Sequence, residues 1–450
     1  IFLISCISFF IIFKVFDMVA LAAGGFIGLL IGAILSKSSE KYWNSVIKGI
    51  GSPTSVSIVV ILLIIGIFTK LMAVSGVSQG FVWLAYTIGI KEGFFTAFSF
   101  LSTCLITTAT GSSIGTLFTA FPILYPAGIL LGSNPSFLAG AILSGAIFGD
   151  NLAPISDVTI ATSSTQEFKY KEGTADIAGV VLYRLKYALI AGSISLILFF
   201  IFGGGGTVSV GAEEILQKNM NPKGLWMLLP VFFLLFTSIK TRDIFKSVTV
   251  GIITGIIIGL LTGAFSVETI LTVENGNIKG FLFEGFNSMI GICIFCIALF
   301  GIMGILNASG AMEYVIRSIC KSNLSQTRRG TEILMALGTI VVTALLGGVT
   351  SASTLTFGPV ANDIGKRMNI HPYRRANILS GYANSLPAII PFISAFIFIS
   401  AIVIKPISEE FSQASVTPMQ ISLGTLYPFI LFIVLTFSIL SGWDVKFEDK

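Results

Sequence analysis

Long apolar stretches without charged residues recur along the chain, separated by short polar segments. They occupy residues 18–36, 49–69, 187–212, 247–267, 285–312, 333–362, 376–404 and 411–443. A membrane-spanning helix needs about 20 mostly apolar residues, whereas strands of a membrane barrel are about half as long and alternate in polarity. Because lipid forces every backbone group to be hydrogen-bonded within a helix or a closed barrel, the pattern predicts an all-α polytopic membrane protein.

One uncharged stretch is too long for a single helix. It runs for 57 residues from Gly93 to Gly149, and a straight helix of that length would overshoot a bilayer core of about 30 Å nearly threefold. The stretch must therefore fold back. Its candidate breaks are the segment TTATGSSIGT (107–116), Pro122, Pro126 and Asn134-Pro135.

A similar Gly, Ser and Thr-rich segment, GGVTSASTLTFGP (347–359), interrupts the stretch 333–362. We interpret both segments as re-entrant hairpins or broken helices with tips inside the membrane. Irregular backbone is tolerated there only when it is buried in protein or lines a wet cavity. The alternative is that these small residues only allow helices to pack closely, which is our interpretation of the glycine ladders at 24–32 and 251–263.

The second half of the chain repeats features of the first at an offset near 234 residues. Leu143-Ser144-Gly145 corresponds to Leu379-Ser380-Gly381, and the motif Asn151-x-x-Pro154 corresponds to Asn384-x-x-Pro387. We therefore predict two transmembrane repeats, residues 1–202 and 225–450, joined by a polar linker at 203–224.

Equivalent loops of the two repeats carry different charges. Their net charges are +2 and −2 for 36–52 and 266–284, 0 and +2 for 77–92 and 309–332, and 0 and +3 for 126–137 and 363–375. Basic loops stay in the cytoplasm, so the equivalent loops are expected on opposite sides of the membrane. This predicts inverted-topology repeats, an architecture in which the transport site lies near the midplane between the copies.

The composition supports a membrane protein and excludes other classes. Only 11% of the residues are charged and 54% are hydrophobic, whereas soluble domains carry about 25% charged residues. The excess of 27 Lys and Arg over 22 Asp and Glu lies in loops and reports topology, so we expect the lipid bilayer as a partner and no nucleic acid. We find no catalytic constellation and expect neither an enzyme nor a cofactor. Because the chain begins at Ile1, we expect its natural N-terminus further upstream.

Two aspartates stand out at the end of the long uncharged stretch, in the segment FGDNLAPISD (148–157). A charged side chain at the bilayer centre costs roughly 2.5–3.5 kcal/mol, so an acid there is a functional hypothesis by default. Pro154 predicts a break in the helix between Asp150 and Asp157, because proline lacks the backbone N–H and clashes with the preceding turn. A break frees backbone carbonyls near Asn151 and can bring both carboxylates towards one point. The alternative is that each aspartate caps a helix or pairs with a loop cation.

Carboxylate, amide, hydroxyl and carbonyl oxygens suit a small hard cation such as Na+. A buried carboxylate also binds a proton more readily than an exposed one, so H+ and Na+ compete for the same oxygens. We predict a transient Na+ site at Asp150, Asp157 and Asn151. The wider ion or substrate site adds polar residues from both repeats: Thr110, Ser112, Ser113, Ser156, Thr159, Thr350, Ser351, Ser353, Thr354, Asn384 and Ser385.

The segments GDNLAPISDVTIA (149–161) and TGSSIGT (110–116) resemble the NhaC-type Na+/H+ antiporters of the ion transporter superfamily. The family often has an aromatic residue inside the second segment, where this chain has Ile114. The resemblance implies a multi-pass exchanger in a bacterial inner membrane that moves Na+ outward against H+. It also implies relatives that exchange organic anions such as malate and lactate.

The leading hypothesis is therefore Na+/H+ antiport, with Na+ and H+ as transported ions. The alternative is a Na+- or H+-coupled transporter of an amino acid or small carboxylate on the same scaffold. An anionic solute is expected to recruit an intramembrane arginine, and none lies inside the uncharged stretches. A channel is disfavoured because the acids occur in one repeat only. We interpret residues 363–375 as a basic surface loop with His371 as a candidate pH sensor, and we include a homodimer among the expected assemblies.

Overall fold

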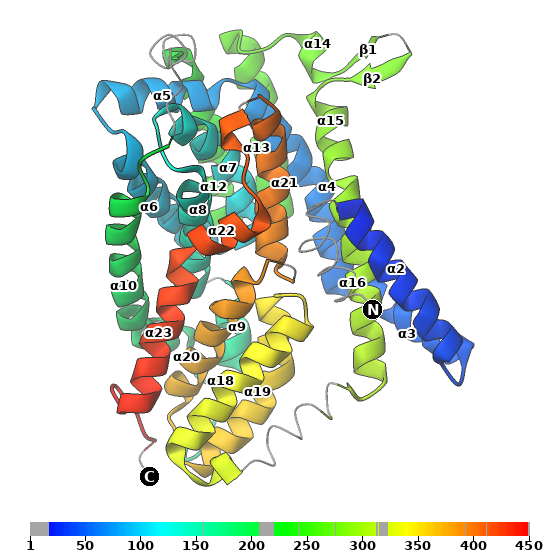
Figure 1. The fold of residues 1–450 in the computed structure, drawn as a ribbon, viewed down its shortest axis with the longest axis vertical. Coiled ribbons are helices and arrows are strands. Elements are labelled where there is room, and N and C mark those ends of the chain that lie inside the picture. The colour runs from blue at the N-terminus through cyan, green and yellow to red at the C-terminus, as the bar shows by residue number, and fades with distance from the viewer. Residues whose placement is uncertain are drawn as a thin grey trace. The chain divides into compact units, whose positions relative to one another are not determined.

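The computed structural model describes residues 18–448 of the chain, apart from 155, 207–219, 242, 275, 312–313, 315–322, 392 and 411. In this part of the chain, the regular structure is helical except for one two-stranded sheet and two isolated bridges (Figure 1). Within the described residues, five helices are long and apolar enough to cross a membrane, or up to seven if two bent pairs count as single spans. The predicted all-α membrane fold is confirmed. Most of the predicted linker lies outside the described residues.

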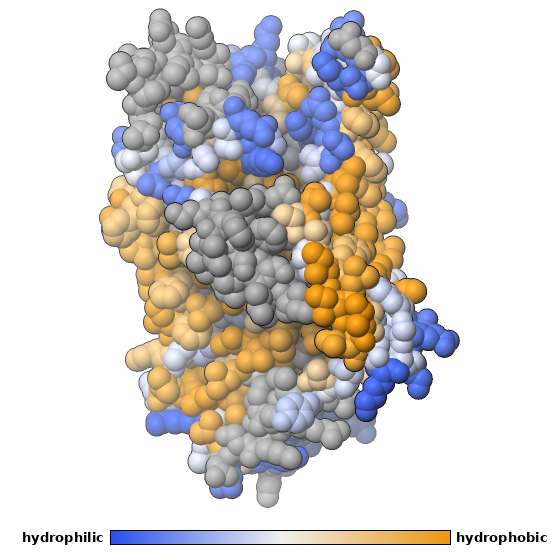
Figure 2. Space-filling model, turned by 45° about the vertical axis from the view of Figure 1, so that its right-hand side comes forward, coloured by the Kyte–Doolittle hydropathy of each residue, from blue (hydrophilic) through white to orange (hydrophobic). Residues whose placement is uncertain are grey.

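Exposed apolar side chains are abundant on the longest helices. They include Leu189, Ile197 and Phe200 on one helix and Ile253 and Leu261 on another. Figure 2 shows broad orange areas of such side chains, with hydrophilic side chains gathered in separate blue areas. Large exposed apolar areas are unusual for a soluble protein and mark contact with lipid or another apolar partner. The protein is therefore a multi-pass membrane protein.

The chain divides into two compact units, each built from both halves of the sequence: residues 1–77 with 223–314, and residues 78–222 with 315–450. The predicted repeat boundaries concern sequence similarity and remain a prediction. The first unit contains α2 (Met18–Leu35), α3 (Ser39–Ile50), α4 (Pro53–Val74), η2 (Pro222–Met227), α12 (Leu228–Thr241), α13 (Ile244–Thr262), α14 (Val267–Ile270), β1 (Thr272–Glu274), β2 (Asn277–Lys279), α15 (Phe281–Ser288) and α16 (Ile290–Ala308).

In the first unit, α16 packs against α2 and α3, and α15 packs against α4. Glycines allow these approaches: a Cβ atom added to Gly49 would lie 2.3 Å from the Phe300 carbonyl oxygen. Residues 36–52, predicted as a loop, instead contain α3. The residues at both ends stabilise this helix. Ser38 caps the first turn, Glu40 lies in that turn and Lys48 lies in the last turn, so each charge interacts favourably with the helix dipole.

The second unit contains the predicted site. Its elements are α5 (Val77–Thr87), α6 (Glu92–Thr110), α7 (Ser113–Leu130), α8 (Pro135–Leu152), α9 (Asp157–Ser164), α10 (Ile177–Phe202), η3 (Asn323–Gln326), α18 (Arg328–Leu345), α19 (Thr350–Arg367), α20 (Pro372–Ala383), η4 (Leu386–Ile389), α21 (Ala395–Glu410), η5 (Ser412–Ala414), α22 (Pro418–Gly424) and α23 (Leu426–Ser441). Within this unit, α8 packs against α6, α7 and α22, whereas α9 packs against α19 and α20 (Figure 1).

The 57-residue uncharged stretch folds back as predicted. Gly111 ends α6 in the left-handed conformation at φ 68°, which glycine adopts without steric cost, and Asn134 caps α8. Pro122 and Pro126 do not break the chain, contrary to the prediction, because both lie inside the continuous and almost fully buried α7. Neighbouring groups in a membrane protein can satisfy the backbone groups that a proline frees.

The second half contains matching breaks. A hairpin joins α18 to α19 through Gly347 and Gly348, both at positive φ, and α20 ends at Ala383, shortly before Pro387. The stretch 411–443, predicted as one span, is also broken: α22 and α23 meet at an angle of 50°. The bend follows Gly424, where a Cβ atom would lie 2.1 Å from the Ser136 carbonyl oxygen.

Backbone conformation supports the internal repeat. Left-handed residues recur at equivalent turns: Gly76 and Gly310, Gly111 and Gly347, and Gly132 and Asn369. The order of elements also matches, because a helical hairpin and a broken helix follow one another in both halves as α6 to α8 and α18 to α20. The inversion of the two copies stays a prediction from the loop charges.

Replacing Gly149 by Val is expected to destabilise the protein. A Cβ atom at this position would lie 2.4 Å from Thr107 Cβ and 2.6 Å from the Thr108 backbone nitrogen, so α6 and α8 would have to separate. Overpacking of this kind costs about 1–3 kcal/mol. The unfolding midpoint of the detergent-solubilised protein is expected to fall, whereas Ile253→Val, which shortens an exposed side chain on α13, is the control and is expected to change it little. An unchanged midpoint for Gly149→Val would contradict the close packing.

Candidate functional site

The break predicted at FGDNLAPISD is present. Helix α8 ends at Leu152 and α9 begins at Asp157, with Ser156 as its N-cap residue. The Asp150 side chain is buried, and Ser156 Oγ donates a hydrogen bond to Asp150 Oδ1 at 2.7 Å. Ser113, at the start of α7, also lies near the Asp150 carboxylate. The structure thus brings a predicted hydroxyl cluster and the predicted acid together.

Asp157 occupies a different environment from Asp150. It is the first residue of α9, and its side chain is exposed at the surface of the protein itself. The two carboxylates are near enough to interact electrostatically. A carboxylate at the first position of a helix is stabilised by the helix dipole. Asp150 is therefore the enclosed acid of the pair, and Asp157 lies at the accessible end of the break.

Arg184 is a site residue that the sequence interpretation missed. It lies on α10, is fully buried, and donates from Nη1 to the Asn151 carbonyl oxygen at 2.5 Å and to Thr159 Oγ1 at 3.1 Å. Its guanidinium thus bridges α8 and α9 across the break. Among the described residues, no carboxylate lies within ion-pair distance of Arg184. The spans were defined as uncharged stretches, so the predicted span 187–212 began just after this residue.

Asn151 does not present the free ligands that the sequence suggested. Its carbonyl oxygen accepts from Arg184, its Oδ1 accepts from Ser380 Oγ at 2.8 Å, and its Nδ2 donates to the Tyr427 hydroxyl at 3.1 Å. The prediction of freed carbonyls at the break is therefore wrong for Asn151. Instead, Asn151 ties the first-half break to α20 and α23.

The other predicted hydroxyl residues form mostly local hydrogen bonds. Ser112 Oγ caps α7 by accepting from Gly115, and Thr110 Oγ1 lies 3.4 Å from Thr116 Oγ1. In the second half, Ser353 Oγ accepts from Thr343 at 2.8 Å and donates to the Thr350 carbonyl oxygen, whereas Thr354 donates to that of Ser351. Within the described residues, Ser113 and Ser156 are the predicted hydroxyls placed at Asp150.

The second-half break contains an amide but no acid. Asn384 follows the end of α20 and is fully buried, and neither Nδ2 nor Oδ1 has a hydrogen-bond partner among the described residues. The adjacent Ser385 Oγ donates to the Tyr382 carbonyl oxygen at 2.8 Å. Asn384 thus differs from its counterpart Asn151, whose amide is hydrogen-bonded at both ends.

The prediction of a basic surface loop at 363–375 is wrong for the last two arginines of that segment. Arg374 and Arg375 lie in the first turn of α20 and are fully buried. Arg375 donates to the Glu167 carbonyl oxygen. Burial, followed by the nearby Lys446, lowers the pKa of His371 to about 4, so its imidazole is neutral near physiological pH. This disfavours the candidate role as a pH sensor, and His371 Nδ1 instead accepts from the Tyr373 backbone at the start of α20.

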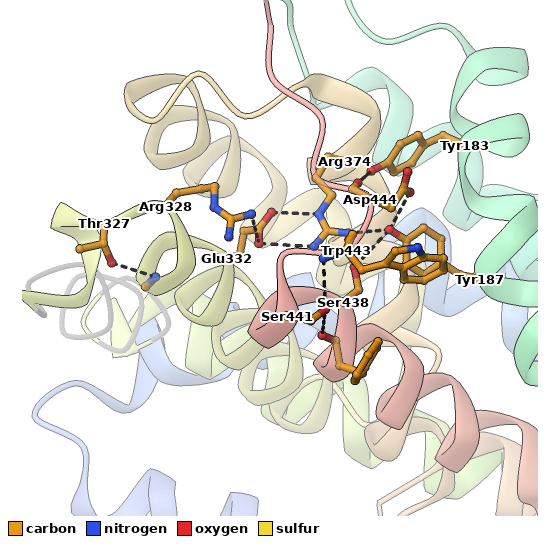
Figure 3. Close-up of polar contacts among 12 residues, drawn as sticks. Tyr183, Tyr187, Thr327, Arg328, Glu332, Arg374, Ser438, Ser441, Trp443 and Asp444 are labelled. Carbon is orange, nitrogen blue, oxygen red and sulfur yellow. Dashed lines mark hydrogen bonds and ion pairs between the residues drawn. The ribbon is translucent and has the colours of Figure 1, made fainter.

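Arg374 is held in a buried polar network (Figure 3). Its Nε donates to Glu332 Oε1 at 2.9 Å, and its Nη1 donates to the hydroxyls of Tyr187 and Ser438, both at 2.7 Å. Tyr187 in turn donates to Asp444 Oδ2 at 2.7 Å. Helices α10, α18, α20 and α23 and the C-terminal segment are thereby joined in one network. These charges therefore join elements within the unit.

Replacing Arg184 by Gln is expected to lower the transport rate by at least about tenfold. The change removes charge-assisted hydrogen bonds worth about 1.5–3 kcal/mol each, so the angle between α8 and α9 is no longer fixed. Arg184→Lys keeps the charge but loses the forked geometry. Its transport rate is therefore expected to lie between those of the wild type and Arg184→Gln. The measurement is the rate at which NaCl dissipates a pH gradient in proteoliposomes. Lys246→Gln, which changes an exposed side chain, is the control. A wild-type rate for Arg184→Gln would contradict the bridging role.

Known proteins with similar sequences are transporters. Residues 1–204 match the model of the Na+/H+ antiporter family. The malate-2H(+)/Na(+)-lactate antiporter of Bacillus subtilis is 25% identical over 340 residues, covering 71% of this chain and 70% of that protein. The Na(+)/H(+) antiporter NhaC of Bacillus subtilis is 24% identical over 316 residues, covering 64% and 66%, respectively. The arginine/ornithine antiporter ArcD of Halobacterium salinarum is 23% identical over 444 residues, covering 94% and 87%.

The similarity is distributed unevenly along the chain. The family match ends at residue 204 and so includes Asp150, Asp157 and Arg184 but not Asn384. The alignment with NhaC spans slightly less than two thirds of that protein. The relatives are transporters with different named substrates, and none is an enzyme by name. The resemblance to NhaC-type Na+/H+ antiporters indicated by residues 149–161 is confirmed, and the chain is a secondary transporter related to that family.

Proposed function

We propose that the protein exchanges Na+ for H+ across a bacterial plasma membrane, and that the two ions compete for the Asp150 carboxylate. The observation that carries this proposal is the placement of Asp150: a buried acid at a helix break, with Ser156 donating to one oxygen and Ser113 nearby. Carboxylate and hydroxyl oxygens are hard ligands suited to Na+. The names of the matching family and of NhaC support the same ions.

The charges around the break suit competition between two cations. Arg184 contributes a buried positive charge, whereas Asp150 and Asp157 contribute two negative charges when ionised. One further cation therefore neutralises the group, and either Na+ or H+ supplies that charge. Because a buried uncompensated charge is costly, the ionised site without a bound cation is disfavoured. The exposed Asp157 gives an arriving cation its first carboxylate, and Asp150 holds it in the interior.

A second candidate function is coupled transport of an amino acid or small carboxylate. Two relatives are named as a malate/lactate antiporter and an arginine/ornithine antiporter. The sequence showed no arginine inside an uncharged stretch, which counted against an anionic solute, but Arg184 lies in α10, seven residues after its start, and is fully buried. The unpartnered amide of Asn384 also favours this candidate.

Purified protein reconstituted into liposomes with an acidic interior tests the proposal. Adding NaCl outside is expected to dissipate the imposed pH gradient, as followed with a fluorescent pH indicator, whereas choline chloride is not. L-lactate, L-malate, L-arginine and L-ornithine are then added in the absence of Na+. Gradient dissipation by one of these solutes with no response to Na+ would overturn Na+/H+ exchange and favour the second candidate.

A further inference from the structure

The amide of Asn384 lacks the partners that its counterpart in the first half has. Asn151 is hydrogen-bonded through both Oδ1 and Nδ2, to Ser380 and Tyr427. Asn384 is fully buried, and both of its side-chain polar atoms are unpartnered among the described residues. Nearly all buried polar groups in native structures are hydrogen-bonded. An amide that is enclosed but unsatisfied therefore points to a bound partner.

The position of Asn384 places it beside the first-half break. Asn384 follows Ser380 by four residues, and its backbone nitrogen donates to the Ser380 carbonyl oxygen at 3.0 Å. Residues four apart lie on the same helix face, and Ser380 faces Asn151 through its 2.8 Å hydrogen bond. Asn377, on the same face one turn before Ser380, is also buried with an unpartnered Nδ2. Two unsatisfied amides thus flank the contact between the breaks.

The chemistry of an amide narrows the class of ligand. Asn384 offers two N–H donors and one acceptor oxygen. A bare cation satisfies the oxygen but leaves both donors unpaired. A carboxylate accepts from Nδ2, and a hydroxyl or ammonium group on the adjacent carbon donates to Oδ1. The buried guanidinium of Arg184, which hydrogen-bonds to the Asn151 carbonyl oxygen, places a positive charge in the same polar region.

We propose that Asn384 is the specificity-determining contact of a solute subsite that takes a small carboxylate with a hydroxyl or ammonium group on the adjacent carbon. This inference rests on the second candidate function and specifies its substrate class. The subsite is contributed by the second half, whereas the cation site at Asp150 is contributed by the first. The two breaks then hold the two ligands of one coupled cycle.

Binding to the purified full-length protein tests this proposal without depending on transport. L-lactate and L-alanine provide both groups, whereas propionate lacks the donor. Calorimetric titrations are made in NaCl and in choline chloride. L-lactate or L-alanine is expected to bind at least about tenfold more tightly than propionate, because an unsatisfied partner costs more than about 1.4 kcal/mol. Asn384→Leu is expected to lower the affinity for the solute at least about tenfold. Asn384→Gln is expected to lower it less.

The exposed Asn307→Leu is the matched control and is expected to bind as the wild type does. Equal binding of propionate, or undiminished binding to Asn384→Leu, would overturn the proposal. So would binding of Na+ alone, with no response to either solute. If Asn384→Leu fails to fold, the comparison of propionate with L-lactate and L-alanine in the wild-type protein still tests the proposal. Failure of Na+/H+ exchange is detected separately, as loss of the NaCl response in liposomes.

Discussion

Asp150→Asn is expected to abolish Na+-dependent proton movement, lowering its rate by at least about a hundredfold. Asparagine keeps the size of the side chain and its acceptor oxygen for Ser156, but it can neither bind a proton in exchange nor supply the negative charge that holds Na+. The charges of Arg184 and Asp157 then sum to zero, so the group no longer needs a further cation for neutrality, and adding one would leave a buried charge uncompensated. The rate of gradient dissipation in proteoliposomes is the measurement.

Asp157→Asn separates the roles of the two acids. Because the Asp157 side chain is exposed, we expect about a tenfold weaker apparent affinity for Na+ with the maximal rate largely retained, in line with a partly screened charge. Unimpaired exchange in Asp150→Asn would contradict the assignment. Complete loss in Asp157→Asn with normal exchange in Asp150→Asn would reverse the two roles.

Glu332→Gln is expected to destabilise the protein strongly. Glu332 and Arg374 form an ion pair at 2.9 Å with both side chains fully buried, and Arg328 Nη1 lies 3.6 Å from the same carboxylate. Removing one partner of a buried pair costs about 3–5 kcal/mol because the other charge is left uncompensated. The unfolding midpoint in detergent is expected to fall by roughly 6 °C or more.

Two comparisons make this prediction specific. Glu274→Gln breaks the exposed pair with Lys279, whose side chains are 56% and 54% exposed, and it is expected to change the midpoint little, since surface pairs contribute about 0–1 kcal/mol. The double variant Glu332→Leu with Arg374→Met removes both charges and is expected to be less destabilised than Glu332→Gln. Equal small shifts for both single variants would contradict the structural role of the network in Figure 3.

Features with a local cause were predictable from the sequence. A charge in an apolar stretch singled out Asp150, Pro154 indicated the break after α8, and Gly111 indicated the hairpin between α6 and α7. Each effect depends on residues within a few positions of the feature. The two Asn-x-x-Pro motifs were also found in this way, and both occur at helix breaks.

Features that depend on distant partners were not predictable. Arg374 resembled a loop cation because its partner Glu332 lies 42 positions away. Arg184 was missed because its hydrogen-bond partners, Asn151 and Thr159, lie on α8 and α9, whereas Arg184 lies on α10. The saturation of the Asn151 amide depends on Ser380 and Tyr427, 229 and 276 positions away. Sequence patterns identify which residues are unusual, whereas only the fold decides whether their polar groups are free.

Proton release on Na+ binding tests the central claim most directly. NaCl is added to the purified protein in weakly buffered detergent solution, and the change in pH is recorded alongside Na+ binding measured by calorimetry. Competition at Asp150 predicts that protons are released as Na+ binds, that acidification of the medium weakens Na+ binding, and that Asp150→Asn loses the release. Na+ binding without proton release across the neutral pH range, or unchanged release in Asp150→Asn, would contradict the account.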